Sequence, residues 1–143
     1  MRDTSLQIRT HDHLRERWSS LGFDALALDE KETVALYWLE GEVMNGGLHQ
    51  FFGNSSGDLT NYVVSGLSRL GATQTLSALE AALAKLGAGP MVCDPTVREE
   101  CLRQLGLDSD PFEFETLTIQ KLPELFFRSA LDALAVKYFP AHV

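Results

Sequence analysis

The chain has 143 residues, of which 45% are hydrophobic, and it carries a formal net charge of −8. This length and apolar content suffice for one domain with a buried core, and they exclude a disordered chain. No stretch approaches the roughly 18 consecutive apolar residues of a membrane-spanning helix, and the first residues lack the apolar core of a signal peptide. Cys93 and Cys101 indicate no disulfide framework, so we expect a cytoplasmic protein.

The acidic charge is concentrated in two segments. Residues 24–45 carry six acids against Lys31, and residues 94–124 carry eight acids against Arg98, Arg103 and Lys121, so each segment sums to −5. Nucleic acids are bound through clustered Lys and Arg, so direct binding of nucleic acid is not expected. A basic partner suits this chain better, although a net charge of this size is also ordinary for a soluble domain.

Apolar residues recur at helical spacing, which predicts an all-α fold: one helical domain over residues 1–143 with about six to seven helices. The first helix is predicted over about residues 11–20. The second begins near Asp29, because Asp29 and Glu32 favour a helix start, and it ends at Asn45. This helix is apolar on more than one face, so we expect it to be central, with a close helix crossing at Gly41.

The next three helices are marked by turn residues. A short helix is predicted over residues 48–52, and Asp58 is the expected N-cap of the helix that follows. That helix ends at Gly71, and another covers residues 73–86 before Gly87.

The C-terminal part is less regular. Asp94 before Pro95 predicts the N-cap of a helix whose buried stripe would consist of Val97, Cys101, Leu102 and Leu105. Residues 107–120 are predicted to form a loop or a short turn, because Phe112 and Phe114 alternate with acids and later apolar residues break that alternation. A last helix follows Pro123 and ends at Phe139-Pro140.

The sequence contains no pattern typical of a metal site or of nucleophilic catalysis. HExxH and CxxC are absent, and His11 and His13 would not share one face of a helix. The segment GNSSG lacks the preceding strand that a nucleophile elbow requires. We therefore expect no metal, no cofactor and no enzymatic activity.

The segment NGGLHQFFGNSSG has a structural explanation in a helix end, a short helix and a turn. Two of its residues, His49 and Gln50, are not explained in this way, and we expect them to be a buried or half-buried polar anchor. The alternative is an enzyme whose cleft would bring His49 and Gln50 together with nearby acids. The structural motif as a whole comprises Asn45, Gly46, Gly47, His49, Gln50, Phe51, Phe52 and Asn54.

The residues from Glu42 to Ala72 (EVMNGG, then LHQFFGNSSG, then a helix ending in RLGA) resemble a bacterial family of acidic DNA-mimic proteins, a domain family of otherwise unknown function. The C-terminal LPELFF and YFPAHV add a weaker likeness. The resemblance implies an all-helical fold with no known cofactor and no established catalytic residues. It also implies a dimer whose surface carboxylates imitate duplex phosphates and occupy the DNA-binding face of a transcriptional regulator. Two copies of a −8 chain would carry −16.

The function expected from these observations is that of a non-catalytic acidic protein that binds a basic DNA-binding protein or another basic protein. The alternative in the same class is an immunity-type protein that neutralises a basic toxin. The candidate contacts are the acids of the two segments: Asp24, Asp29, Glu30, Glu32, Glu40 and Glu42 in the first, and Glu99, Glu100, Asp108, Asp110, Glu113 and Glu115 in the second.

Overall fold

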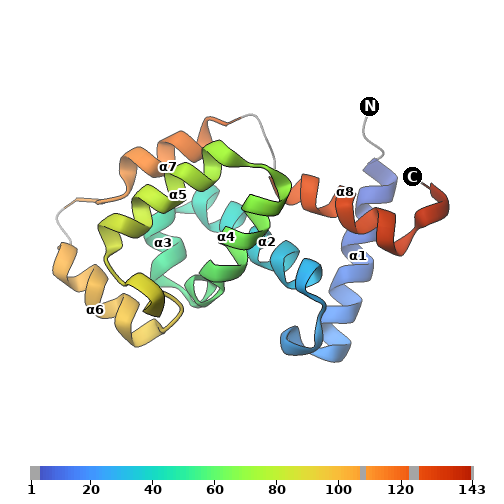
Figure 1. The fold of residues 1–143 in the computed structure, drawn as a ribbon, viewed down its shortest axis with the longest axis horizontal. Helices are drawn as coiled ribbons and strands as arrows, with labels where there is room; N and C mark the ends of the chain where they lie inside the picture. The colour runs from blue at the N-terminus through green and yellow to red at the C-terminus, as the bar shows by residue number, and fades with distance from the viewer. Residues whose placement is uncertain (1–3, 107–108, 123–125, 143) are drawn as a thin grey trace.

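A computed structural model of the chain describes residues 4–106, 109–122 and 126–142. These residues form eight α-helices, four short 3-10 helices and no β-strand, so the all-α prediction is confirmed and the helix count is slightly higher than predicted (Figure 1). The α-helices are α1 (Thr4–Leu21), α2 (Leu28–Asn45), α3 (Leu48–Gly53), α4 (Thr60–Leu70), α5 (Thr73–Leu86), α6 (Pro95–Leu105), α7 (Glu113–Gln120) and α8 (Phe126–Tyr138). The 3-10 helices are η1 (Phe23–Ala25), η2 (Ser55–Leu59), η3 (Gly89–Met91) and η4 (Pro140–His142).

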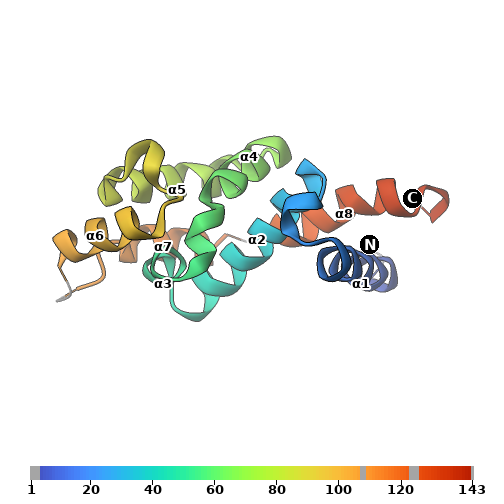
Figure 2. The same cartoon turned by 90° about the horizontal axis from the view of Figure 1, so that it is seen from below.

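Helix α2 is the central element, as predicted from its apolar circumference. It contacts α4, α8, α3 and α7, and its residues 32–36 are buried in an unbroken run that covers more than one face. In Figures 1 and 2, α1 and α8 lie at one end of the molecule and α5, α6 and α7 at the other, with α2 joining the two ends.

Two clusters of buried apolar side chains follow this division. The larger one packs α2 to α7 around Leu39, Phe51, Phe52, Leu67 and Phe112, with the start of α8 at its edge. The smaller one joins α1, α2 and α8, and it consists of Leu14, Leu26, Val34 and Leu134 with Trp18, Phe23 and Tyr138 packed against them. Helix α2 therefore contributes to both clusters.

The close helix crossing occurs at Gly66 of α4 and not at Gly41. A Cβ atom added at Gly66 would lie 3.2 Å from the Cβ of Glu32 and 3.2 Å from the Cδ1 of Leu36, both on α2. Gly41 is exposed and has no atom within 4 Å of such a Cβ. The prediction for Gly41 is wrong because that face of α2 has no helix packed on it at this point.

Several predicted helix ends are confirmed. The Asp94 carboxylate accepts hydrogen bonds from the backbone N–H groups of Thr96 and Val97 at the start of α6. Gly71 and Gly87 end α4 and α5 with φ of 72° and 77°, the left-handed conformation that glycine adopts without strain. Asp58 is not an N-cap. Helix α4 begins after it at Thr60, and the Asp58 carboxylate pairs with Arg98 instead.

Three predictions about helix extents are corrected. Helix α1 begins at Thr4, well before residue 11. Residues 113–120 form α7 and not a loop, with Phe112 and Ile119 buried and Phe114 76% exposed. Pro123, the expected start of the last helix, lies outside the described residues, and α8 is described from Phe126.

The buried face of α6 also differs from the prediction. Its fully buried residue is Arg98, whereas Val97, Cys101 and Leu102 are half-buried and Leu105 is exposed. The pattern of apolar residues does not predict a buried arginine on this face, because it assigns every charged residue to the solvent-exposed side of a helix.

Candidate functional site

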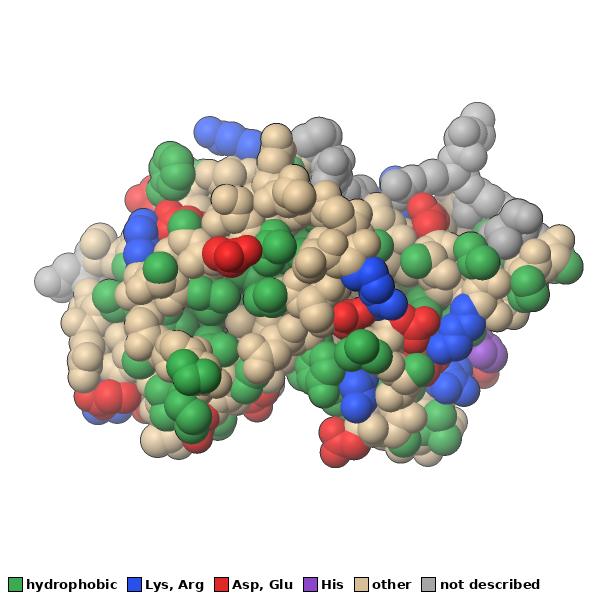
Figure 3. Space-filling model, viewed as in Figure 1, with side chains coloured by type: hydrophobic (Ala, Val, Ile, Leu, Met, Phe, Trp, Pro, Cys, Tyr) green, Lys and Arg blue, Asp and Glu red, His purple; other side chains and the backbone are tan. Residues whose placement is uncertain are grey.

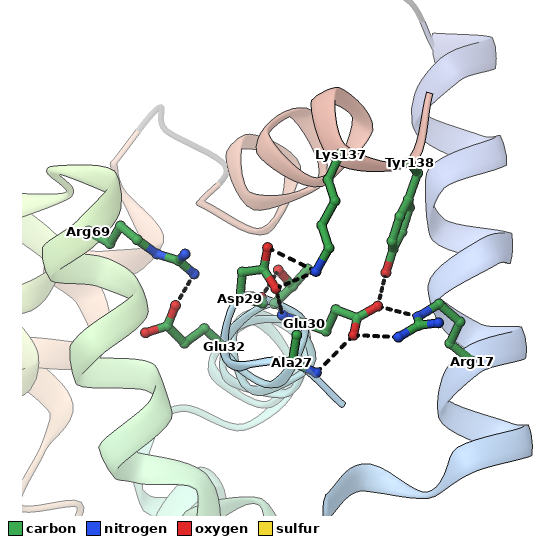
Figure 4. A network of polar contacts seen from close by, with 9 residues as sticks. Arg17, Ala27, Asp29, Glu30, Glu32, Arg69, Lys137 and Tyr138 are labelled. Atoms are coloured by element: carbon green, nitrogen blue, oxygen red, sulfur yellow. Dashed lines mark hydrogen bonds and ion pairs between the residues drawn. The ribbon is translucent and has the colours of Figure 1, made fainter. Parts of the chain in front are cut away.

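The first acidic segment, residues 24–45, includes the whole of α2. Its most deeply buried carboxylate belongs to Glu30 in the first turn of that helix. Arg17 of α1 donates two hydrogen bonds to it, at 2.5 and 3.0 Å, and the Tyr138 hydroxyl donates a third at 2.5 Å (Figure 4). The backbone N–H of Ala27 donates a fourth at 2.9 Å. The carboxylate thus joins α1 and α8 to α2.

Burial alone would raise the pKa of Glu30, because a buried charge loses its hydration. The hydrogen bonds from Arg17, Tyr138 and Ala27 outweigh burial and lower the pKa of Glu30 to about 2. Burial and the neighbouring Glu30 carboxylate raise the pKa of Tyr138, so its hydroxyl stays protonated and remains a donor. Glu30 is therefore a charged group at neutral pH, neutralised inside the protein.

Two more acids of this segment are paired with other helices. The Glu32 carboxylate is buried, forms an ion pair with Arg69 of α4 and accepts a hydrogen bond of 2.5 Å from Ser65. Asp29 pairs with Lys137 of α8 at 3.1 Å (Figure 4). The acids at the start of α2 thereby form ion pairs with basic side chains of three other helices, α1, α4 and α8.

The remaining acids of the segment have different environments. Asp24 is exposed, and Glu40 and Glu42 are half-buried. Burial raises the pKa of Glu40 in spite of the opposing effects of Arg128 and of the Phe127 backbone N–H. The expectation that Glu30 and Glu32 contact a partner is wrong, since both are buried and paired within the chain.

The second acidic segment places most of its described carboxylates in solvent. Glu99 and Glu100 of α6 are exposed and both lie near Arg103, at 3.8 and 2.5 Å. Asp110 and Glu113 are exposed and form no ion pair with a described residue.

Two members of the second segment are not available as exposed contacts. The Glu115 carboxylate is buried and pairs with Lys85 of α5 at 2.6 Å, so the expectation that it contacts a partner is wrong. Asp108 lies outside the described residues.

The exposed acids of the second segment lie at one end of the molecule. Helix α6 forms that end, and α7 begins beside it (Figure 1). The space-filling view shows acidic side chains over this end among hydrophobic and uncharged ones (Figure 3). The structure thus separates the two segments. In the first, only Asp24 is exposed and three of the six acids are ion-paired to other helices, whereas most described acids of the second are exposed.

The segment NGGLHQFFGNSSG (residues 45–57) forms a polar link between α2 and α3. Gln50 donates a hydrogen bond of 2.6 Å to Oε2 of Glu42, and the Asn54 amide donates another of 3.1 Å to the same oxygen. Both Gln50 and Glu42 are half-buried, so Gln50 is the polar anchor that the sequence predicted.

The two glycines of this segment permit close approaches. A Cβ added at Gly46 would lie 1.9 Å from Oε1 of Gln50, so a larger residue would displace the Gln50 side chain. Gly47 has φ of 88° and faces Thr116 of α7, whose hydroxyl accepts a hydrogen bond of 3.0 Å from the Leu48 backbone N–H. These residues therefore set the angle at which α3 leaves α2 and meets α7.

His49 has a different environment from Gln50. It is half-buried and lines a cavity of about 670 Å³ between α3, η2 and α6, together with Asp58, Arg98 and Glu99. Gln50 does not line this cavity. The two residues that the enzyme alternative would bring together thus point to different places, Gln50 toward Glu42 and His49 toward α6.

Arg98, at the back of this cavity, was not identified from the sequence. Its side chain is 2% exposed and donates hydrogen bonds to the carbonyl oxygens of Phe52, Asn54 and Val92, and to Asp58 Oδ1 at 2.6 Å. One feature of the sequence could have indicated that Arg98 is buried. Cys101 and Leu102, which are half-buried, follow it by three and four residues and so lie on the same face of α6.

Among the described residues, no helix is long and apolar enough to cross a bilayer, and no group of three or more His, Cys, Asp or Glu side chains is arranged to hold a metal ion.

Taken together, the helices and the internally paired carboxylates define an acidic all-α protein. The chain belongs to the DMP19-like protein family, whose model matches residues 24–142. Comparison with curated proteins gives no match, and comparison with solved structures gives none.

Proposed function

We propose that this chain is a non-catalytic acidic protein that binds a basic DNA-binding protein on its DNA-binding surface, as a DNA mimic does. The observation that carries the proposal is the exposure of Glu99, Glu100, Asp110 and Glu113 at the end formed by α6 and the start of α7. Of these four, Asp110 and Glu113 have no ion pair with a described residue, so their charge is available to an incoming cation.

The contrast between the two acidic segments supports this choice of surface. Carboxylates that are paired inside the protein attract little from outside, because each is neutralised within a few ångströms. The charge that a partner meets is therefore concentrated at the exposed carboxylates, and two of these, Asp110 and Glu113, form no ion pair with a described residue. The resemblance of the core segment to acidic DNA-mimic proteins supports the same kind of partner.

The proposal of a non-catalytic role is supported by the positions of His49 and Gln50. Gln50 is held by Glu42, and Arg98, which lines the same cavity as His49, already donates to four protein oxygens. A catalytic group needs its partner within hydrogen-bond reach of one reacting atom, and these residues do not converge in that way.

The experiment is capture of proteins from an extract of the source cells on the immobilised chain, followed by elution with salt or with duplex DNA. We expect basic DNA-binding proteins to be retained and to be released by duplex DNA. Their retention should fall steeply between roughly 50 and 200 mM salt, as it does for contacts that replace phosphate charges. Retained proteins that ignore both duplex DNA and ionic strength would contradict mimicry.

A matched pair of variants locates the surface. The triple variant Glu99→Gln, Glu100→Gln and Glu113→Gln removes three exposed charges from the α6–α7 end. The control Asp12→Asn, Glu16→Gln and Glu80→Gln also removes three exposed charges, from α1 and α5. We expect the first variant to lose the basic partners and the control to retain them. Equal losses would show that net charge matters and that this surface does not.

A further inference from the structure

A second cavity, of about 360 Å³, lies between α1, η1, α2 and η2. Its walls carry three aromatic rings, from Trp18, Phe23 and Trp38, beside two aliphatic side chains. In the space-filling view the molecule is hollowed between the η2 side and the η1 side, with hydrophobic side chains along the hollow (Figure 3). A volume near the lower limit for small-molecule sites suits one side chain or one small ligand.

The charged groups of this cavity are carboxylates. Those of Glu42 and Asp58, together with two serines, complete its lining, and none of the described Lys or Arg residues contributes to it. The amides of Gln50 and Asn54 both donate to Oε2 of Glu42, and no described residue donates to Oε1. The carboxylate thus has one oxygen free for a ligand.

The existing cations nearby are already engaged outside the cavity. Arg98 binds Oδ1 of Asp58 from the other side, where it also holds three backbone carbonyl groups. Lys31 lies 5.9 Å from the centre of the Phe23 ring and 5.7 Å from that of Tyr62, and it does not line the cavity. The two tryptophan rings meet edge to face, with centroids 6.5 Å apart and planes at 87°, and neither has a described cation over it.

We propose that this cavity binds the guanidinium group of an arginine side chain from the partner protein. Aromatic faces attract cations through their quadrupole, and tryptophan does so most strongly. A planar guanidinium can stack on an indole ring and donate to a carboxylate at the same time, which a lysine ammonium cannot do equally well. The cavity provides both features, with Trp18 and Trp38 as faces and Glu42 as the acceptor.

This inference rests on the proposed function, since it names one residue type that a basic partner would insert. It uses a different surface from the exposed acids of α6 and α7. A chain that fails to bind arginine here can still bind a basic protein through α6 and α7, so the two proposals fail separately.

Tryptophan fluorescence provides a direct test, because Trp18 and Trp38 are the only tryptophans of the chain and both line the cavity. The probe is N-acetyl-arginine amide, titrated into the full chain at constant ionic strength. The matched probe is the citrulline derivative, which has nearly the same shape but no charge. We expect a saturable change in emission with the arginine derivative, and binding at least tenfold weaker for citrulline.

Two variants test the geometry. Glu42→Gln keeps an acceptor for Gln50 and Asn54 but removes the charge, and Trp38→Leu removes one aromatic face. Each should weaken binding by about three- to thirtyfold, the range expected for a single cation–π or charged contact, while Trp38→Phe should weaken it less. Circular dichroism of each variant establishes that the fold is retained.

The inference would be overturned by an equal response to arginine and citrulline, or by no saturable response up to tens of millimolar. Binding that persists unchanged in both Glu42→Gln and Trp38→Leu would also overturn it, because the probe would then occupy another place and report through long-range effects. A lysine derivative that binds as tightly as arginine would refute the choice of guanidinium.

Discussion

Tyr138, near the end of the chain, donates a hydrogen bond of 2.5 Å to the buried carboxylate of Glu30, which lies 108 residues earlier. Arg17 binds the same carboxylate from α1. The N-terminal and C-terminal helices are thus attached to α2 through one charged group, and the stability of that end of the molecule should depend on it.

We expect Glu30→Gln to lower the free energy of unfolding by about 2–4 kcal/mol, because it removes the charge that compensates Arg17 and weakens four hydrogen bonds. Urea denaturation followed by circular dichroism measures the change. The control is Glu16→Gln on the exposed face of α1, for which we expect a change within about 0.5 kcal/mol. Equal stabilities of the Glu30→Gln variant and the unchanged chain would contradict a stabilising role for this carboxylate.

The same group predicts a pH dependence. The pKa of Glu30 is about 2 in the folded chain, below the ordinary value of 4.5, so the folded state binds this proton less readily than the unfolded state. Its contribution is fully present above pH 4.5 and is lost as the pH falls from 4.5 toward 2. We expect a loss of about 3 kcal/mol over this range. Urea titrations at pH 5.5, 4.5 and 3.5 should show a clearly shallower decline for Glu30→Gln, and parallel curves would refute the assignment.

Arg98 leads to a third prediction. Replacing it by methionine would leave three backbone carbonyl groups and the Asp58 carboxylate without their donor, so we expect a loss of about 3–5 kcal/mol. Lysine should restore little of it, because one ammonium cannot reach four oxygens in these directions. Arg103→Met on the exposed side of α6 is the control and should change stability by less than about 1 kcal/mol. Similar values for the two methionine variants would show that Arg98 does not tie α6 to α3.

Two glycines form a matched test of helix packing. Gly66→Ala would insert a methyl group at the crossing of α2 and α4, where its neighbours lie at 3.2 Å, so crowding there offsets the gain in helix propensity that alanine brings. Gly41→Ala adds the same group in open space within α2, where alanine favours the helix by about 0.5–1 kcal/mol. Gly41→Ala should therefore raise the denaturation midpoint, and Gly66→Ala should raise it less or lower it. An equal or larger increase for Gly66→Ala would contradict the described crossing.

Much of the fold follows from features that the sequence displays directly. Asp94 before a proline caps α6 as expected, and Gly71 and Gly87 end two helices in the left-handed conformation. The central position of α2 follows from its apolar circumference. These predictions succeed because each depends on interactions within a few residues of the chain.

Two of the failures, at α6 and α7, share a physical cause, which is the burial of a charged side chain. The broken alternation of apolar residues and acids predicts a loop or a short turn at residues 107–120, whereas the structure has α7 there, with an inner face that includes Glu115, which hydrophobic periodicity counts as polar. The buried face of α6 was misjudged for the same reason at Arg98. Partners for these charges come from 30 and 40 residues away, Lys85 and Asp58, and local patterns carry no information about them.

The candidate site shows the same limit. In the sequence, the two acidic segments carry the same net charge of −5. Glu30 and Glu32 are therefore predicted as partner contacts in the same way as Glu99 and Glu100. The structure distinguishes them by burial: Glu30 and Glu32 are enclosed and paired with arginines of other helices, whereas Glu99 and Glu100 stay exposed beside Arg103 of their own helix. The role of polar anchor expected for His49 and Gln50 is found for Gln50, whose partner is Glu42 of the preceding helix.

The buried carboxylates of Glu30, Glu32 and Glu115, three among the described residues, have a consequence for chemical labelling. A carbodiimide and a small amine modify carboxyl groups that solvent can reach, so the folded chain should react at its surface acids and spare Glu30, Glu32 and Glu115. These three become reactive only when α2 separates from α1 and α4, or α7 from α5. Mass spectrometry of the labelled chain would then report, residue by residue, which helix contact opens first as the protein is heated.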